Sequence, residues 1–257
     1  MKYQFGDSDL AGRRLAKVAE VFAPTSRDFL ANAGSARSAL AIDLGCGPGF
    51  TTALIAQTLE PSVTVGLDRS ESFLQAARTN PAAARARFLC HDVRETPFPE
   101  RSADLIFCRF LLTHLAEPAA VVQSWRGELA PKGRLLLEEV EAIHTEQPAF
   151  AFYLDTVEAM LAASGTKLYI GPHLSDDLAG SALDNQVVSL RVTNADAARM
   201  FSMNVPNWRN NDWVRENIDA ARLDQLEAEL AQFAEGGGTN SDIDWELRQL
   251  ALSARRK

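Results

Sequence analysis

The segment AIDLGCGPGF at residues 41–50 constrains the fold more than any other part of this chain. A short apolar run leads directly into three glycines, at positions 45, 47 and 49. A strand that ends in a glycine-rich turn before a helix is typical of nucleotide-binding α/β sheets. A dinucleotide fingerprint, Gly-x-Gly-x-x-Gly, would place its third glycine where this chain has Phe50. The loop therefore predicts a nucleotide site that lacks the dinucleotide pattern.

Two neighbours of the glycines indicate the charge of the ligand. Pro48 has no backbone N–H, so the loop lacks one of the donors that a pyrophosphate would use. Asp43 stands at the end of the strand, where its carboxylate would repel a phosphate and attract an ammonium or sulfonium group. The loop therefore favours a nucleoside that carries positive charge.

Composition and charge narrow the class of protein. The 257 residues are 46% hydrophobic and 23% charged, which suits one large globular α/β domain. A net charge of −8 without long runs of Lys or Arg argues against a nucleic-acid partner. The three cysteines, Cys46, Cys90 and Cys108, lack the spacing of a disulfide framework and indicate reduced thiols in a cytoplasmic protein. Because no long apolar run is present, we expect neither secretion nor contact with a membrane.

The apolar residues of the N-terminal region follow helical spacing. They predict a helix that begins at Ser8 or Asp9 and stops at Pro24, followed by a second short helix up to Gly34. We expect residues 1–34 to form a helical segment over the nucleotide site.

From residue 39 onward, strands and helices alternate, which predicts a mostly parallel sheet with both faces covered. The expected strands are Ala39–Leu44, Ser62–Leu67, Arg87–Cys90, Asp104–Arg109 and Arg134–Glu139, and the expected helices are Thr51–Leu59, Ser70–Arg78 and Pro118–Leu129. After residue 140 the alternation fails. We therefore expect residues 35–257 to form one doubly wound α/β domain with helical cap insertions at about 141–182 and 195–240.

Polar residues follow successive strands of the predicted sheet. Asp68, Asp92 and Arg109 stand at the ends of the second, third and fourth strands, where ligands of doubly wound sheets bind. Asp68 can accept hydrogen bonds from ribose hydroxyls, and Asp92 can accept one from an adenine amino group. Either acid alone is explained as well by a helix cap. Their order along the strand ends indicates one nucleoside site.

Four segments occur in order between about residues 39 and 140: AIDLGCGPG, VGLDRS, CHDVRETPFPERSADLIFCRFLLTHL and LAPKGRLLLEE. They resemble the class I S-adenosylmethionine-dependent methyltransferases. The resemblance implies a Rossmann-like, seven-stranded sheet with an antiparallel last strand, in which Gln186–Val192 and Leu247–Ala254 are the final two strands. The phrases YQFGDSDLAGRRL and RFLLTHLAEP resemble a subgroup that acts mainly on small molecules.

The resemblance also implies a cofactor, S-adenosyl-L-methionine, with S-adenosyl-L-homocysteine as its product. The residues it assigns to cofactor binding are Asp43, Gly45, Cys46, Gly47, Gly49, Asp68, Arg69, Asp92, Val93, Arg109, Tyr3 and Arg14. In this assignment Asp43 lies near the methionine amino group. Asp68 holds the ribose, and Asp92 holds the adenine together with the Val93 backbone.

Three further assignments concern the methionine end of the cofactor. Arg109 matches a position whose backbone lines that end. Tyr3 and Arg14 reach over the cofactor from the N-terminal helix, although an arginine on an amphipathic helix is commonly a solvated residue.

The implied reaction is an in-line displacement that moves a methyl group to O, N or C of a small organic acceptor. Alignment and exclusion of water can carry this reaction without a dedicated base. If a base is used, His114 is the best-placed histidine, and a structural role at a helix end explains it as well. The residues expected to bind the acceptor are His114, Glu139, His144 and Trp208. Glu138 and Glu139 point to opposite faces of a strand, so no metal site is expected.

The sequence allows more than one role for each of two aromatic stretches. The segment NVPNWRNNDW at residues 204–213 suits an amphipathic acceptor pocket, or a cap that is anchored by buried tryptophans. For Phe150, Phe152 and Tyr153, burial of an apolar helix face is the favoured interpretation.

Other functions compete with methylation of a small molecule. A protein methyltransferase and a module that binds the cofactor without catalysis are the alternatives. A nicotinamide dehydrogenase is disfavoured by Pro48 and Asp43, and a nucleic-acid methyltransferase by CRFLLTHL, which stands where an Asn/Asp-Pro-Pro-Tyr motif would lie. The identity of the acceptor and the oligomeric state, a homodimer included, stay open.

Overall fold

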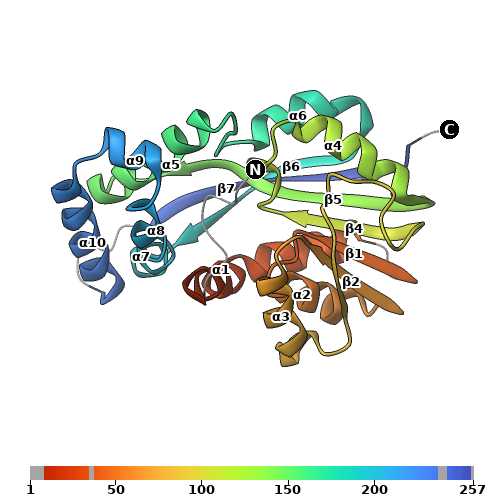
Figure 1. Cartoon of the computed structure of the whole chain (residues 1–257). Helices are drawn as coiled ribbons and strands as arrows, with labels where there is room; N and C mark the ends of the chain where they lie inside the picture. The colour runs from red at the N-terminus through yellow and green to blue at the C-terminus, as the bar shows by residue number, and fades with distance from the viewer. Residues whose placement is uncertain (1–8, 35–37, 237–241, 256–257) are drawn as a thin grey trace.

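A computed structural model describes residues 9–34, 38–236 and 242–255 (Figure 1). In this part of the chain one sheet has the strand order β3-β2-β1-β4-β5-β7-β6. Its strands are β1 (Leu40–Leu44), β2 (Val63–Asp68), β3 (Arg87–Cys90), β4 (Ala103–Arg109), β5 (Leu129–His144), β6 (Ala182–Val192) and β7 (Ile243–Ser253). Neighbours among β1 to β5 pair in parallel, and β7 runs antiparallel to β5 and β6. The predicted seven-stranded, doubly wound sheet with an antiparallel last strand is confirmed.

Helices cover both faces of the sheet. Helices α1 (Asp9–Ala33), α2 (Phe50–Leu59) and α3 (Glu71–Thr79) lie on one side, and α4 (Pro118–Trp125) and α6 (Gly171–Leu178) lie on the other (Figure 1). Because side chains alternate along a strand, each strand feeds both layers. Phe107 of β4 packs with Phe29 and Leu30 of α1, whereas its neighbour Ile106 packs with Trp125 of α4. Burial on both faces explains the continuous apolar runs in the sequence.

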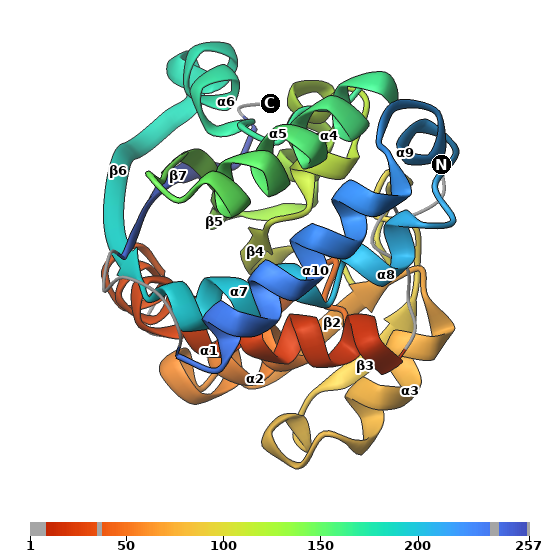
Figure 2. The same ribbon diagram turned by 90° about the vertical axis from the view of Figure 1, so that its left-hand side faces the viewer.

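The remaining helices form a cap beyond one end of the sheet (Figure 1). They are α5 (Pro148–Ala163), α7 (Asn194–Ser202), α8 (Val205–Trp208), α9 (Asp212–Asn217) and α10 (Ala220–Ala234), and short 3₁₀ turns occur at Pro81–Ala83, Leu112–His114, Arg126–Glu128 and Ala179–Ser181. Helix α7 packs against both α10 and α1 (Figure 2). The core of the cap joins Phe150 and Phe201 to Phe22 of α1 and Trp245 of β7.

The predicted break at Pro24 is wrong, because α1 runs without interruption from Asp9 to Ala33. A proline inside a helix costs about 3 kcal/mol, since it lacks an N–H and crowds the preceding turn. Both sides of this proline are anchored by burial, through Phe22 before it and Phe29 after it. Tertiary packing therefore keeps the two halves in one helix.

Strand β5 is longer than the sequence indicates. The predicted helix Pro118–Leu129 ends at Trp125, and β5 starts at Leu129. Residues 131–133, which were predicted to form a turn before the strand, lie within β5. They shift its register against β4, since Ala103 pairs with Leu129 but Leu105 pairs with Arg134. At its other end β5 continues to His144, beyond the last residue that pairs with β4, and it does so by pairing with β7. This extension carries the sheet toward the cap.

None of the helices in the described ranges is long and apolar enough to cross a membrane.

Candidate functional site

A cavity of about 760 Å³ opens at the carboxyl ends of β1 to β4, between α1 and the cap. Pockets that hold one drug-sized ligand usually enclose about 300–1,000 Å³, so this cavity has room for a nucleoside cofactor and a small second ligand. Its position is the one that doubly wound sheets use for ligands. Within the described ranges, no group of three or more His, Cys, Asp or Glu residues could hold a metal ion.

The glycine loop uses its backbone donors internally. The N–H groups of Gly45 and Cys46 donate to the Leu67 carbonyl at 2.8 and 3.1 Å, and Gly49 N–H donates to the Cys46 carbonyl at 3.0 Å. Gly47 N–H donates to Asp68 Oδ2 at 2.9 Å. A helix-end phosphate site needs backbone N–H groups that point at the anion. This loop has already committed its own, which disfavours a pyrophosphate.

Two carboxyl groups lie at the loop. Asp43 is buried behind the cavity wall, and its Oδ2 accepts a hydrogen bond of 2.6 Å from Thr52 Oγ1. Burial raises the pKa of Asp43 to about 7, against the opposing effects of Thr52 and the positive charge of Arg109. Asp68 lines the cavity; burial raises its pKa, and the N–H groups of Ser70 and Gly47 oppose that rise. The loop therefore has two carboxyl groups beside it, which in their ionised form attract a positively charged ligand.

The segment after β3 forms the opposite wall. Asp92 and Val93 both line the cavity, as does Arg69. The guanidinium of Arg94 binds both carboxylate oxygens of Asp92, at 2.5 to 3.1 Å, and these hydrogen bonds lower the pKa of Asp92 to about 2. Trp125 Nε1–H donates to the Val93 carbonyl at 2.7 Å, which fixes the backbone there.

Arg109 lines the cavity, and its guanidinium is held on the α1 side of the sheet. It donates to Ser26 Oγ at 2.8 Å and to Thr51 Oγ1 at 3.2 Å. Ser26 Oγ in turn donates to Glu138 Oε1 at 2.5 Å, and Gln249 Nε2 donates to Glu138 Oε2 at 2.6 Å. This buried network joins α1, β4, β5 and β7 at the floor of the site.

Arg14 and His114 also line the cavity, whereas Tyr3 lies outside the described residues. Burial lowers the pKa of His114 to about 3, and the positive charges of Arg14 and Arg69 lower it further. At neutral pH this imidazole is uncharged and only weakly basic. That makes it a poor proton acceptor for catalysis.

Three residues expected to bind the acceptor do not line the cavity. Glu139 is buried beside it, where its Oε1 accepts hydrogen bonds of 2.8 Å from the N–H groups of Leu111 and Leu112. The His144 side chain is 62% exposed. Trp208 is buried in the cap, with its ring stacked on Tyr153 at a centroid distance of 4.8 Å.

The part of the cavity that faces the cap is walled by aromatic and aliphatic side chains. We call it the apolar chamber; it is formed by aliphatic residues of α1, β5 and α5 together with Phe22, Phe110, Tyr153, Phe201, Asn204 and Trp245. Asn204 Nδ2 donates to Tyr153 Oη at 2.5 Å, and the Tyr153 ring stacks on Phe201 at a centroid distance of 4.0 Å.

The sequence analysis singled out only some of the residues that form the apolar chamber. The stretch NVPNWRNNDW contains Asn204, but Trp208 was the residue of this stretch that was predicted to bind the acceptor. Tyr153 was interpreted as a core residue, and it is both buried and part of the cavity wall. Trp245 carried no distinguishing signal, because its place depends on the pairing of β7 with β5.

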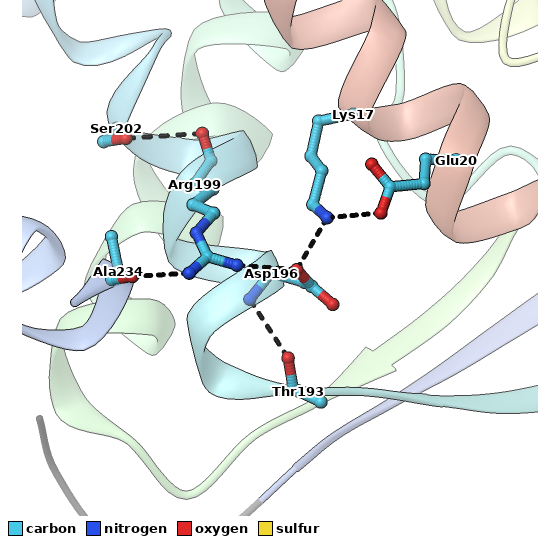
Figure 3. Close-up of polar contacts among 7 residues, drawn as sticks. All are labelled: Lys17, Glu20, Thr193, Asp196, Arg199, Ser202 and Ala234. Carbon is cyan, nitrogen blue, oxygen red and sulfur yellow. Dashed lines mark hydrogen bonds and ion pairs between the residues drawn. The ribbon is translucent and has the colours of Figure 1, made fainter. Parts of the chain in front are cut away.

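Ion pairs hold the cap wall to α1 (Figure 3). Lys17 Nζ lies 2.8 Å from Asp196 Oδ1 and 2.9 Å from Glu20 Oε1. Arg199 Nη1 binds the same Asp196 oxygen at 3.2 Å, and its Nη2 donates to the Ala234 carbonyl of α10 at 3.0 Å. Helix α7 is therefore tied on one side to α1 and on the other to α10.

Part of the chain is similar to known methyltransferases. Residues 42–137 match the family model described as a methyltransferase domain. The chain is similar to trans-aconitate 2-methyltransferase of Methylobacterium radiotolerans, with 41% identity over 38% of this chain and 37% of that protein. It is also similar to the enzyme of the same name from Delftia acidovorans, with 33% identity over 49% of this chain and 51% of that protein. The similarity thus spans about half or less of these relatives.

Solved structures share the fold. A putative methyltransferase from Bacillus halodurans aligns over 90% of this chain and 98% of its own, with a TM-score of 0.57 and 17% identity. A Haemonchus contortus phosphoethanolamine N-methyltransferase, solved with S-adenosylhomocysteine, aligns over 97% of this chain and 60% of its own, with a TM-score of 0.55 and 15% identity. At these identities the likeness concerns architecture.

Proposed function

We propose that this chain, a member of the class I S-adenosylmethionine-dependent methyltransferases, transfers the methyl group of S-adenosyl-L-methionine to O, N or C of a small organic acceptor. The glycine loop carries this proposal. Its N–H groups are already bound within the protein, and the carboxylates of Asp43 and Asp68 lie around it. That environment suits a cofactor with an ammonium and a sulfonium group.

The residues of the cavity fit the parts of this cofactor. Asp68 offers carboxylate oxygens to the ribose hydroxyls, and Asp92 with the Val93 backbone lines the adenine side. Gly45 and Gly47 both line the cavity, so the cofactor can approach the backbone closely. The bound cofactor supplies an electrophilic methyl group on a positively charged sulfur.

The chain contributes alignment and exclusion of water rather than strong base catalysis. With S-adenosyl-L-methionine bound, the chain would hold the acceptor atom in line with the methyl carbon and the sulfur, and the neutral thioether S-adenosyl-L-homocysteine would be the leaving group. A hydroxyl or amine acceptor would release its proton to solvent once the product leaves the chamber. The apolar chamber excludes bulk solvent from this step, and His114 at a pKa of about 3 serves as a neutral wall residue.

The chamber favours a small acceptor over the two alternatives. A peptide segment of a protein substrate would need an open groove, whereas this acceptor space lies between α1 and the cap. A sensor without activity would not need a second apolar space beside the cofactor. In the same proposal, α1 and the cap helices α5 and α7 to α10 cover the Rossmann-like domain. Nucleic acid is not a substrate of this chain of net charge −8.

Two properties of the whole protein belong to this proposal. We place it in the cytoplasm, because Cys46, Cys90 and Cys108 are free thiols. We also propose a homodimer that forms through the edge strand β6, on which Leu183 and Val187 are 59% and 41% exposed. Light scattering of the wild type and of Leu183→Lys would show a dimer that the substitution weakens; a wild-type monomer contradicts the dimer.

Calorimetric titration with S-adenosylhomocysteine tests the cofactor site. We expect micromolar binding by the wild type, no binding of NAD, and loss of binding in Asp68→Ala. Asp68→Asn keeps one acceptor oxygen for the loop N–H groups and retains part of the affinity. Glu71→Gln, an exposed change on α3, is the matched control. A wild type that binds NAD and not S-adenosylhomocysteine refutes the proposal.

A further inference from the structure

The charged side chains that line the cavity are unevenly distributed over its wall. Its arginines come from the first half of α1, from the loops after β2 and β3 and from the last residue of β4; they are Arg14, Arg69, Arg94 and Arg109. Arg94 is paired with Asp92, and Arg109 is bound by Ser26 and Thr51. The elements of the cap side, β5, α5, α7 and β7, bring no charged side chain to the cavity wall.

An acceptor with several carboxylates would therefore meet an unsuitable wall. Moving a carboxylate from water into apolar surroundings is strongly unfavourable unless a cation and hydrogen-bond donors receive it. Phe22, Phe110, Phe201 and Trp245 provide ring faces and edges instead, with Phe22 in edge contact with both Phe110 and Trp245 at centroid distances of 5.0 and 5.1 Å. This wall suits a flat apolar molecule.

The chamber also contains polar atoms without partners. Asn204 is 2% exposed, and while its Nδ2 binds Tyr153 Oη, its Oδ1 has no hydrogen-bond partner in the described part of the chain. Rotating the amide would leave the Nδ2 group unpaired instead, so one polar atom of Asn204 is unsatisfied in either orientation. Trp245 Nε1 also lacks a partner there. Buried polar atoms in proteins are rarely left unpaired, and a ligand group is one way to pair them.

Most of this wall lies outside the part of the chain that the family model matches. The matched methyltransferase domain covers residues 42–137, which excludes α1, α5, α7 and β7. The matched domain contains the glycine loop, whereas Phe22, Tyr153, Phe201, Asn204 and Trp245 of the chamber lie outside it. The acceptor class must therefore be argued from the chamber itself.

Resting on the proposed function, we propose that the acceptor is a neutral, largely apolar ring compound with one hydroxyl or amine group, which hydrogen-bonds to Asn204. The aromatic wall binds the ring system, and Asn204 orients the polar group. A tricarboxylate such as trans-aconitate is not the acceptor of this chain. Asn204 is on this view a specificity-determining residue.

Binding to the full chain saturated with S-adenosylhomocysteine tests the proposal, with fluorescence of the tryptophans and calorimetry as readouts. The probes are 1-naphthol, 1-methoxynaphthalene, which lacks the hydroxyl hydrogen, and trans-aconitate. We expect 1-naphthol to bind at least about 100-fold more tightly than trans-aconitate, because the chamber can pair no carboxylate. Tighter binding of trans-aconitate, or binding of neither naphthalene, overturns the proposal.

Variants separate the role of Asn204 from general packing. Asn204→Leu should weaken 1-naphthol about tenfold, as expected for one lost hydrogen bond, and leave 1-methoxynaphthalene within about twofold. Asn210→Ala, an exposed change in the turn after α8, should leave both affinities unchanged. If Asn204→Leu does not fold, Trp245→Phe removes the other unpaired atom while keeping a ring. Equal losses for both naphthalenes would contradict an orienting hydrogen bond.

The two proposals fail in different ways. If the wild type does not bind S-adenosylhomocysteine, the cofactor assignment falls, and the same probes without the nucleoside still decide the chemistry of the chamber. If S-adenosylhomocysteine binds but trans-aconitate is the preferred second ligand, only the acceptor class falls.

Discussion

Lys17 Nζ on α1 lies 2.8 Å from Asp196 Oδ1 on α7, and this ion pair joins the first helix of the described chain to the cap (Figure 3). Val18, the next residue of α1, and Met200, one turn further along α7, both line the cavity. The two side chains of the pair are 17% and 28% exposed, so water screens their attraction only in part. The pair therefore holds together two walls of one site.

Removing the Lys17–Asp196 ion pair should destabilise the protein, and the effects of the two single substitutions should not be additive. We expect Lys17→Met and Asp196→Asn each to lower the free energy of unfolding, and the double variant to lose about 0.5–1 kcal/mol less than the sum. Urea unfolding of the four proteins measures the coupling. Glu20→Gln is the control, because the Glu20 side chain is 71% exposed and its loss should have little effect. Simple additivity of the two substitutions would contradict a direct interaction.

Protonation of His114 should limit stability in acid. Its folded-state pKa of about 3 lies below the reference value of 6.5, so the unfolded chain binds the proton more readily. The stability that neutral His114 contributes is present above pH 6.5 and is lost as the pH falls toward 3. Between pH 7 and pH 5 this amounts to about 2 kcal/mol.

Urea unfolding at both pH values tests this. The stability of the wild type relative to His114→Gln should fall by that amount, whereas the exposed variant His173→Gln should follow the wild type. A His114→Gln protein with the same pH dependence as the wild type would refute the prediction.

Glu139 should behave as a neutral acid in the folded protein at pH 7. Burial raises its pKa to about 8, despite the opposing N–H groups of Leu112 and Leu111. A glutamine keeps an acceptor oxygen for both N–H groups, so Glu139→Gln should change the free energy of unfolding by less than about 1 kcal/mol at pH 6. Glu139→Ala leaves both N–H groups without that acceptor and should cost about 3 kcal/mol.

The pH dependence of Glu139 has a definite sign. Because its folded-state pKa lies above the reference value of 4.5, its contribution to stability is full below pH 4.5 and is lost as the pH rises through 8. From pH 6 to pH 8 the wild type should lose about 2 kcal/mol relative to Glu139→Gln. Denaturation curves of both proteins at pH 6 and pH 8 measure this difference. Parallel behaviour of the two proteins would mean that Glu139 is ionised in the folded state.

The glycine loop offers a test of backbone conformation. Gly49 has a φ of 80°, and a Cβ there would lie 2.9 Å from Phe88 Cζ. Gly49→Ala should therefore cost about 2–4 kcal/mol of stability, from the left-handed backbone and the contact together. Gly127, where a Cβ would meet nothing within 4 Å, is the matched control, and Gly127→Ala should be neutral. Thermal unfolding of both variants compares them, and equal melting temperatures would contradict the prediction.

Local patterns sufficed to bring together the cavity residues at the strand ends. Its residues lie in loops that directly follow strands, so the positions of Asp68, Asp92 and Arg109 in the sequence also place them at one edge of the sheet. The opposite faces of Glu138 and Glu139 followed from the alternation of a strand, and the structure confirms them, with Glu138 bound to Ser26 and Glu139 to Leu111.

Local patterns failed where distant packing outweighs them. Pro24 signals a break, but the burial of Phe22 and Phe29 keeps α1 intact. His144 directly follows the residues at the site, yet the extension of β5 along β7 carries its side chain into solvent.

The sequence by itself determined the doubly wound sheet and the chemistry of the glycine loop, because both depend on residues that are neighbours in the chain. Only the tertiary structure decided the apolar chamber. Phe22, Tyr153, Asn204 and Trp245 come from α1, α5, the start of α8 and β7, and they meet only when β7 inserts beside β5 and the cap closes over α1. Contacts between such distant segments arise from the packing of whole elements, and spacing along the chain carries no record of them.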